Sequence, residues 1–299
     1  MEFLHKDREQ FLEAINLTEY QTGIIAQIIE KDYYVTMILR LLADRSSYIV
    51  FKGGTSLSKC HKAIKRFSED IDITVDTKLS QGARKKIKYD IIDIVEELGL
   101  KILNLDETRS RRDYNKYVIA YDTVLPMLNE EMQPEVLIET SYMTISFPTV
   151  ILPVSNYIGE MMITEAPELI QTYALGAFKM KVQGIDRTLA DKVFAVCDYY
   201  LDNSVKKHSR HIYDIYKLLP LVKLDGDFKK LAAEVREIRK ASPKCPSAQD
   251  DVNIPELLRI IIQKEVYKTD YKEITEKILA EPITYEVAIE ALKQVSDSW

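Results

Sequence analysis

The sequence predicts an α+β protein in which a lobe built on a mixed sheet, flanked by helices, precedes an all-helical lobe. Several short segments within 47–147 are rich in Ile, Val, Tyr and Thr, which is typical of strands. Helical apolar spacing lies ahead of them, and from about residue 166 the spacing is helical again. We therefore expect a first lobe over 1–165 and a second over 166–299, each large enough to bury its own core.

The first lobe is expected to begin with two helices and then to alternate strands with helices. A helix over 80–98 is indicated by Ile87, Ile91 and Ile94, with Gly99 as its end. The complete prediction, in chain order, is helices at 7–16 and 18–43, a strand at 47–52, a helix at 55–65, a strand at 70–76, the helix at 80–98, and strands at 100–107, 114–124 and 134–147.

The second lobe is expected to be helical throughout, because apolar residues recur there at spacings of three and four. The stretch 241–255 contains three prolines and few apolar residues, so it predicts a surface loop. The expected helices are 186–202, 208–219, 225–240, 254–266, 270–280 and 284–296.

The composition is that of an ordinary globular protein. Of 299 residues, 46% are hydrophobic and 29% charged, and no stretch reaches the roughly 18 apolar residues of a membrane span. Three scattered cysteines and a charged N-terminus without a signal-peptide core predict a cytoplasmic protein. A net charge of −6 argues against indiscriminate nucleic-acid binding, although basic segments at 84–88 and 206–211 are either solvated faces or parts of a local basic track.

A glycine pair followed by hydroxyl residues predicts a phosphate-binding turn. Gly53 and Gly54 let the backbone approach a phosphate closely, and Thr55 and Ser56 stand where a helix is expected to begin. The backbone N–H groups and hydroxyls there are suitable phosphate ligands. The local order is not that of a P-loop, because no glycine precedes Lys59, so ATPase chemistry of that class is not supported.

An acidic pair follows inside an apolar run. Alternation along the strand 70–76 places Asp70 and Asp72 on one face. Adjacent carboxylates repel each other unless a cation compensates their charge. Two carboxylates suit Mg²⁺, an ion whose coordination shell substrate phosphates usually complete. The alternative is a solvent-exposed polar strand face. Together with the glycine pair, the carboxylates predict a site of nucleotidyl or phosphoryl transfer.

These two motifs resemble those of a known family. FKGGTSLSK (51–59) and RFSEDIDI (66–73) are similar to the pattern of DNA polymerase beta-like nucleotidyltransferases, in which Gly-Gly or Gly-Ser precedes Asp-x-Asp. With EKDYYVTMILRLL (30–42), RTLADK (187–192) and RHIYDIYKLL (210–219), in that order, they resemble the AbiEii/AbiGii toxin family over roughly residues 30–220.

The resemblance implies further site residues, each with a structural alternative. Arg66 would neutralise a phosphate or pair with an aspartate, and Ser68 would bind a triphosphate oxygen or cap a turn. Glu139 would be a third carboxylate, either a metal ligand or a base, unless it lies on a surface edge. Lys192 would contact the triphosphate unless it is solvated. Asp214 would orient Lys192 or a substrate group, unless it makes only a helix salt bridge.

One position departs from the family pattern. The family usually has Arg-Asp ahead of Tyr-Asp, whereas this chain has His211-Ile212. We expect His211 to lie at the surface or to contact a phosphate.

The resemblance implies a Mg²⁺-dependent nucleotidyltransferase that moves a nucleoside monophosphate from an NTP to an acceptor. It also implies a bacterial toxin of a toxin–antitoxin or phage-defence system, with a cognate antitoxin and the 3′ end of tRNA as acceptor. The second lobe would contribute Lys192 and Asp214 to a cleft. The alternatives are transfer of a nucleotide or phosphate to protein, a related enzyme with a non-toxic role, and a catalytically silent nucleotide-binding module.

Overall fold

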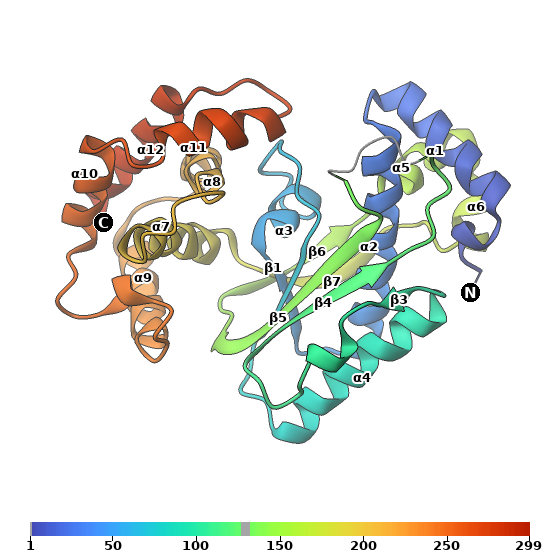
Figure 1. Ribbon diagram of the computed structural model, residues 1–299, viewed down its shortest axis with the longest axis horizontal. Helices are drawn as coiled ribbons and strands as arrows, with labels where there is room; N and C mark the ends of the chain where they lie inside the picture. Colours follow the sequence, from blue (N-terminus) through green and yellow to red (C-terminus); the bar gives the residue numbers. More distant parts are fainter. Residues whose placement is uncertain (1, 127–131) are drawn as a thin grey trace. The chain divides into compact units, whose positions relative to one another are not determined.

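The computed structural model describes residues 2–126 and 132–299, which form two compact units (Figure 1). Unit 1 comprises the chain up to Thr55, Glu69–Ile145 and Thr149–Val182. Unit 2 comprises Ser56–Ser68, Ser146–Pro148 and Gln183–Trp299. Two short segments from the first half of the chain therefore belong to the unit that is otherwise formed by the C-terminal part.

A seven-stranded sheet in the order β3-β4-β5-β2-β1-β7-β6 is the centre of unit 1. It is mixed, because β2 runs antiparallel to β1 but parallel to β5, and β1 runs parallel to β7. This confirms the predicted fold class. The strands are β1 (Ile49–Lys52), β2 (Ile71–Val75), β3 (Lys101–Ile102), β4 (Tyr114–Ala120), β5 (Glu135–Ile145), β6 (Thr149–Val154) and β7 (Phe178–Gln183).

Unit 1 also contains helices, and several of their predicted bounds were wrong: the second helix, for example, begins at Ala26 rather than at residue 18. The first helix runs on to Thr22 and ends at Gly23, whose φ of 70° only glycine adopts readily. The helix predicted at 55–65 begins at the glycine pair and ends at Lys59. The helices are α1 (Arg8–Thr22), α2 (Ala26–Arg45), α3 (Gly53–Lys59, which continues into unit 2), α4 (Gln81–Glu97), α5 (Tyr157–Glu165) and α6 (Pro167–Thr172).

The prediction that only helices follow residue 166 was wrong, because β7 lies at Phe178–Gln183 and pairs with the central strand β1 through Phe51 and Val182. The sequence of β7, FKMKVQ, alternates apolar with polar residues over six positions, which is a strand pattern that the prediction overlooked. The edge strand β6 was also missed. Its exposed Val150 and Ile151 and its proline give it neither alternation nor a buried run.

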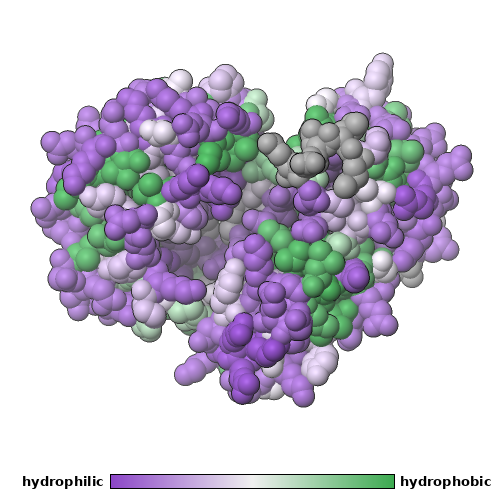
Figure 2. Space-filling view, in the orientation of Figure 1, coloured by the Kyte–Doolittle hydropathy of each residue, from purple (hydrophilic) through white to green (hydrophobic). Residues whose placement is uncertain are grey.

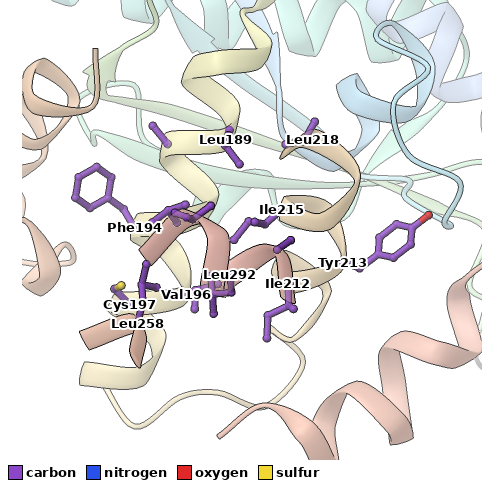
Figure 3. Packing of buried hydrophobic residues seen from close by; sticks show 14 of the residues in the cluster. Leu189, Phe194, Val196, Cys197, Ile212, Tyr213, Ile215, Leu218, Leu258 and Leu292 are labelled. Carbon is purple, nitrogen blue, oxygen red and sulfur yellow. The ribbon is translucent and has the colours of Figure 1, made fainter. Parts of the chain in front are cut away.

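Unit 2 is helical, as predicted. Its main helices are α7 (Ile185–Leu201), α8 (Arg210–Leu218), α9 (Gly226–Lys240), α10 (Ile254–Gln263) and α12 (Tyr285–Ser298). The predicted helix at 270–280 is instead a short α11 (Lys268–Asp270), a π-helical turn (Tyr271–Thr275) and a 3₁₀ turn (Glu276–Ile278). Figure 3 shows side chains of α7, α8, α10 and α12 pointing toward one another, among them Leu189, Ile215, Leu258 and Leu292. Each such buried side chain stabilises the fold by about 1.5–3 kcal/mol.

The surface of unit 1 is mostly hydrophilic in the view of Figure 2, with an apolar patch over the part that carries β3 and β4. Leu103 and Leu105 are among the exposed apolar residues of this region. Within residues 2–126 and 132–299, no helix combines the length and apolarity that a bilayer crossing requires.

Candidate functional site

A row of four charged residues crosses the sheet of unit 1. In the strand register, Lys52 of β1 lies opposite Asp72 of β2, and Asp72 lies opposite Glu139 of β5. Glu139 in turn lies opposite Lys116 of β4. Residues directly opposite each other in a sheet project from the same face. The row therefore places two carboxylates side by side between two lysines, and it joins Asp72 to the predicted third carboxylate.

The donor set of this row suits a divalent cation. Asp70 lies just before β2, two residues ahead of Asp72, so alternation brings it to the same face. Adjacent carboxylates on a sheet are destabilising without a compensating charge. Among the described residues, no group of three or more His, Cys, Asp and Glu side chains forms a complete metal cage. An ion held by two carboxylates and completed by substrate phosphates, as is usual for Mg²⁺, needs no such cage.

Gly53 packs directly against the carboxylate of Asp72. Its φ of 77° lies in the left-handed region, and a Cβ atom built on it would lie 1.8 Å from Asp72 Oδ2. Glycine is therefore required twice at this position, for its backbone conformation and for the space beside the carboxylate. The remainder of the predicted turn, Gly54, Thr55 and Ser56, is buried in the first turn of α3. Its role in phosphate binding stays a prediction.

We expect a Gly53→Ala substitution to displace the Asp72 side chain and to lower activity by about a hundredfold, the cost of misplacing a group in such a site. The positive φ adds roughly 1 kcal/mol of backbone strain. Gly82→Ala is the matched control, because Gly82 has no positive φ and its Cβ would meet nothing nearer than 3.8 Å. Comparable rates for the Gly53→Ala variant and the wild-type protein would show that this contact is unimportant.

Tyr114 belongs to the same cluster and was not predicted. It lies on β4, two residues from Lys116 and therefore on the same face. Burial raises the pKa of its hydroxyl, and so do the nearby charges of Glu139, Asp72 and Asp70 together with a hydrogen bond to Glu139. The hydroxyl therefore remains protonated and can donate to Glu139. The only sequence signal was a tyrosine in phase with Lys116 on a predicted strand.

A second cluster of predicted site residues lies wholly within unit 2. Arg66 Nε donates to Asp214 Oδ1 at 2.7 Å, and Arg66 Nη2 donates to Asp214 Oδ2 at 2.9 Å. Lys192 Nζ lies 2.9 Å from Asp214 Oδ2. Arg66 thus pairs with an aspartate, one of the two roles considered for it, and Asp214 contacts Lys192. Ser68 lies in the same unit and is half-buried.

Two neighbouring cations keep the carboxylate of Asp214 ionised. Asp214 is fully buried, and burial alone would raise its pKa, but Arg66 and Lys192 outweigh burial and hold the pKa well below its usual range. Burial lowers the pKa of Lys192, and Asp214 opposes that shift. The side chain of Lys192 is 10% exposed.

His211 is buried, and the expectation that it lies at the surface was wrong. Its side chain is held between α8 and α7, where Nδ1 lies 3.2 Å from Lys192 Nζ. Its ring is parallel to that of Tyr199, with centroids 5.6 Å apart. Helix α8 is buried on more than one face, since Ile212 and Ile215 pack into the apolar core, so amphipathic spacing alone could not place His211.

Comparison with known proteins identifies the family to which the chain belongs. A family model described as "Nucleotidyl transferase AbiEii toxin, Type IV TA system" matches residues 39–295. Among solved structures, the nucleotidyltransferase toxin MenT4 of Mycobacterium tuberculosis is similar with a TM-score of 0.58 and 16% identity, over 94% of this chain and 87% of that chain. No curated protein matches the sequence.

Proposed function

The chain belongs to the AbiEii family of nucleotidyltransferase toxins of type IV toxin–antitoxin systems, and we propose that it transfers a nucleoside monophosphate from an NTP to the 3′ end of tRNA. The observation that carries the proposal is the row in which Asp72 and Glu139 lie side by side, with Gly53 packed against Asp72. The tRNA acceptor is inferred from the family resemblance of the motifs. We further propose that the reaction takes place in the cytoplasm, where NTPs and tRNA are present.

In the proposed mechanism, Asp70 and Asp72 would hold Mg²⁺ together with the triphosphate. The bound ion would neutralise phosphate charge and polarise the α-phosphate. Glu139 accepts the proton of the incoming RNA hydroxyl, and Tyr114 donates to Glu139 and orients it. The hydroxyl oxygen forms a bond to the α-phosphorus, the bond from that phosphorus to the bridging oxygen breaks, and pyrophosphate leaves.

Residues of unit 2 bind the triphosphate in this proposal. Lys192 offers its ammonium group as a point charge to a phosphate, while Asp214 holds it in place and Arg66 compensates Asp214. Ser68 and the turn at Gly53–Ser56 supply further hydrogen-bond donors. The protein's contribution is therefore positioning and charge neutralisation, without a covalent intermediate.

The test is to incubate the purified protein with Mg²⁺ and each NTP in turn, labelled at the α- or γ-phosphate, with total tRNA or with total protein. We expect label from the α-position, and none from the γ-position, on the 3′ end of tRNA. The cognate antitoxin should suppress this transfer or its effect on growth. Transfer of γ-label to protein would show a kinase instead, and nucleotide binding without any transfer would show a silent binding module.

A further inference from the structure

The Lys192 ammonium group has a second buried partner besides Asp214. Lys192 Nζ lies 3.2 Å from His211 Nδ1, and His211 is only 8% exposed. Lys192 Nζ lies 2.9 Å from the Asp214 carboxylate, and a carboxylate at this distance favours the charged form of the ammonium group against its burial. A charged ammonium group has three donors and no lone pair, so His211 Nδ1 must be the acceptor. The ring proton of His211 therefore resides on Nε2.

The charges around the imidazole keep it neutral. Two cations of the buried cluster, Arg66 and Lys192, both pair with Asp214. The charges of Arg210 and His208 also disfavour a positive charge on the ring, whereas the charge of Asp214 favours one. Burial lowers the pKa of His211 well below its ordinary value, and Lys192 lowers it further. The Nδ1 lone pair is thus available to Lys192 over the ordinary pH range.

The ring is also held in one orientation. His211 lies parallel to Tyr199, with an interplanar angle of 3°, and Tyr199 stacks on His208 with centroids 3.4 Å apart. Of the three donors of Lys192, one is directed to Asp214 and one to His211. The third donor is the one that a phosphate oxygen would accept in the proposed reaction.

We propose that His211 is a positioning residue for the transfer reaction, and that its Nδ1 lone pair acts with Asp214 to direct the Lys192 ammonium group toward the NTP triphosphate. This inference rests on the proposed function. It gives a physical role to a residue that departs from the family pattern.

The kinetic test compares two substitutions of His211. His211→Asn keeps an amide oxygen near the position of Nδ1, whereas His211→Phe keeps a ring against Tyr199 and removes the acceptor. We expect His211→Phe to raise the KM for NTP about tenfold, with a smaller change in kcat, because one hydrogen bond to a charged group is lost. His211→Asn should restore the KM to within about threefold of wild type. Equal KM values in the two variants, whether raised or unchanged, would overturn the proposal.

A spectroscopic test needs no activity. Long-range ¹H–¹⁵N correlation spectra of histidine-labelled protein, without nucleotide, should show His211 protonated on Nε2 and unprotonated on Nδ1 at neutral pH. Lys192→Met should shift the Nδ1 resonance. A proton on Nδ1 in the wild-type protein would refute the positioning role. If the wild-type protein transfers no nucleotide, the proposed function fails, and these spectra still decide how His211 contacts Lys192.

Discussion

An Asp72→Asn variant is expected to keep its fold but to transfer nucleotide about a thousandfold more slowly than wild type. Loss of one electrostatic contact to a transition state has an effect of this size. The amide has the size of the carboxylate but lacks its charge, so it is a poor ligand for a divalent ion. It also removes one of the two carboxylates that lie opposite each other on β2 and β5. Initial rates with α-labelled NTP and saturating tRNA measure the effect.

The matched control for this variant is Asp76→Asn. Asp76 follows β2 in the same alternation phase, but its Oδ2 pairs with Lys181 Nζ at 2.5 Å, and no part of the proposed mechanism uses it. We expect its transfer rate to stay near that of wild type. Similar rates for Asp72→Asn and Asp76→Asn would show that the Asp72 carboxylate is not needed for transfer.

An Asp214→Ala variant is expected to lower the free energy of unfolding by about 3–5 kcal/mol, because it leaves the buried Arg66 and Lys192 without their shared counter-ion. Urea unfolding followed by circular dichroism measures the change. The control is Glu281→Ala, which removes a solvent-exposed ion pair with Lys65 in the same unit and should leave the unfolding midpoint unchanged. Equal midpoints for the two variants would contradict the structural role of Asp214.

The same aspartate predicts a pH dependence of stability. The pKa of Asp214 in the folded protein lies below its ordinary value of 3.8, so the folded state binds this proton less readily than the unfolded state. Its contribution is therefore fully present above that ordinary value and is lost as the pH falls below it. Asp214→Asn should remove this part of the acid dependence. A variant that loses stability on acidification as steeply as wild type would rule out that contribution.

The sequence predicted which side chains share a face of a strand, but it did not predict which strands pair with each other. Alternation over 70–76 placed Asp72 on the face opposite Ile71 and Ile73, and in the structure Asp72 is half-buried while both isoleucines are buried. The register that sets Asp72 beside Glu139 joins strands 67 residues apart in the chain, and no local pattern encodes it. The close approach of Gly53 to Asp72 depends on the same tertiary arrangement.

The cluster of Arg66, Lys192 and Asp214 in unit 2 was likewise predicted only in part. The sequence resemblance pointed to Lys192 and Asp214, and the structure shows their contact. His211 was expected at the surface or in contact with a phosphate, but its imidazole is buried and its Nδ1 lies 3.2 Å from Lys192 Nζ. Strand β7 has a local signal in the alternation of FKMKVQ, but its pairing with β1, about 130 residues away in the chain, has none.

The most direct test of the site is anomalous diffraction from crystals of the protein grown with Mn²⁺ and a non-hydrolysable NTP analogue. Mn²⁺ accepts the same oxygen ligands as Mg²⁺ and can be located by its anomalous signal. We predict a peak within coordination distance of the Asp70 and Asp72 carboxylates, with the triphosphate bound to the same ion. Ordered nucleotide and metal bound elsewhere, with these two carboxylates making no contact to either, would contradict the assignment of the active site.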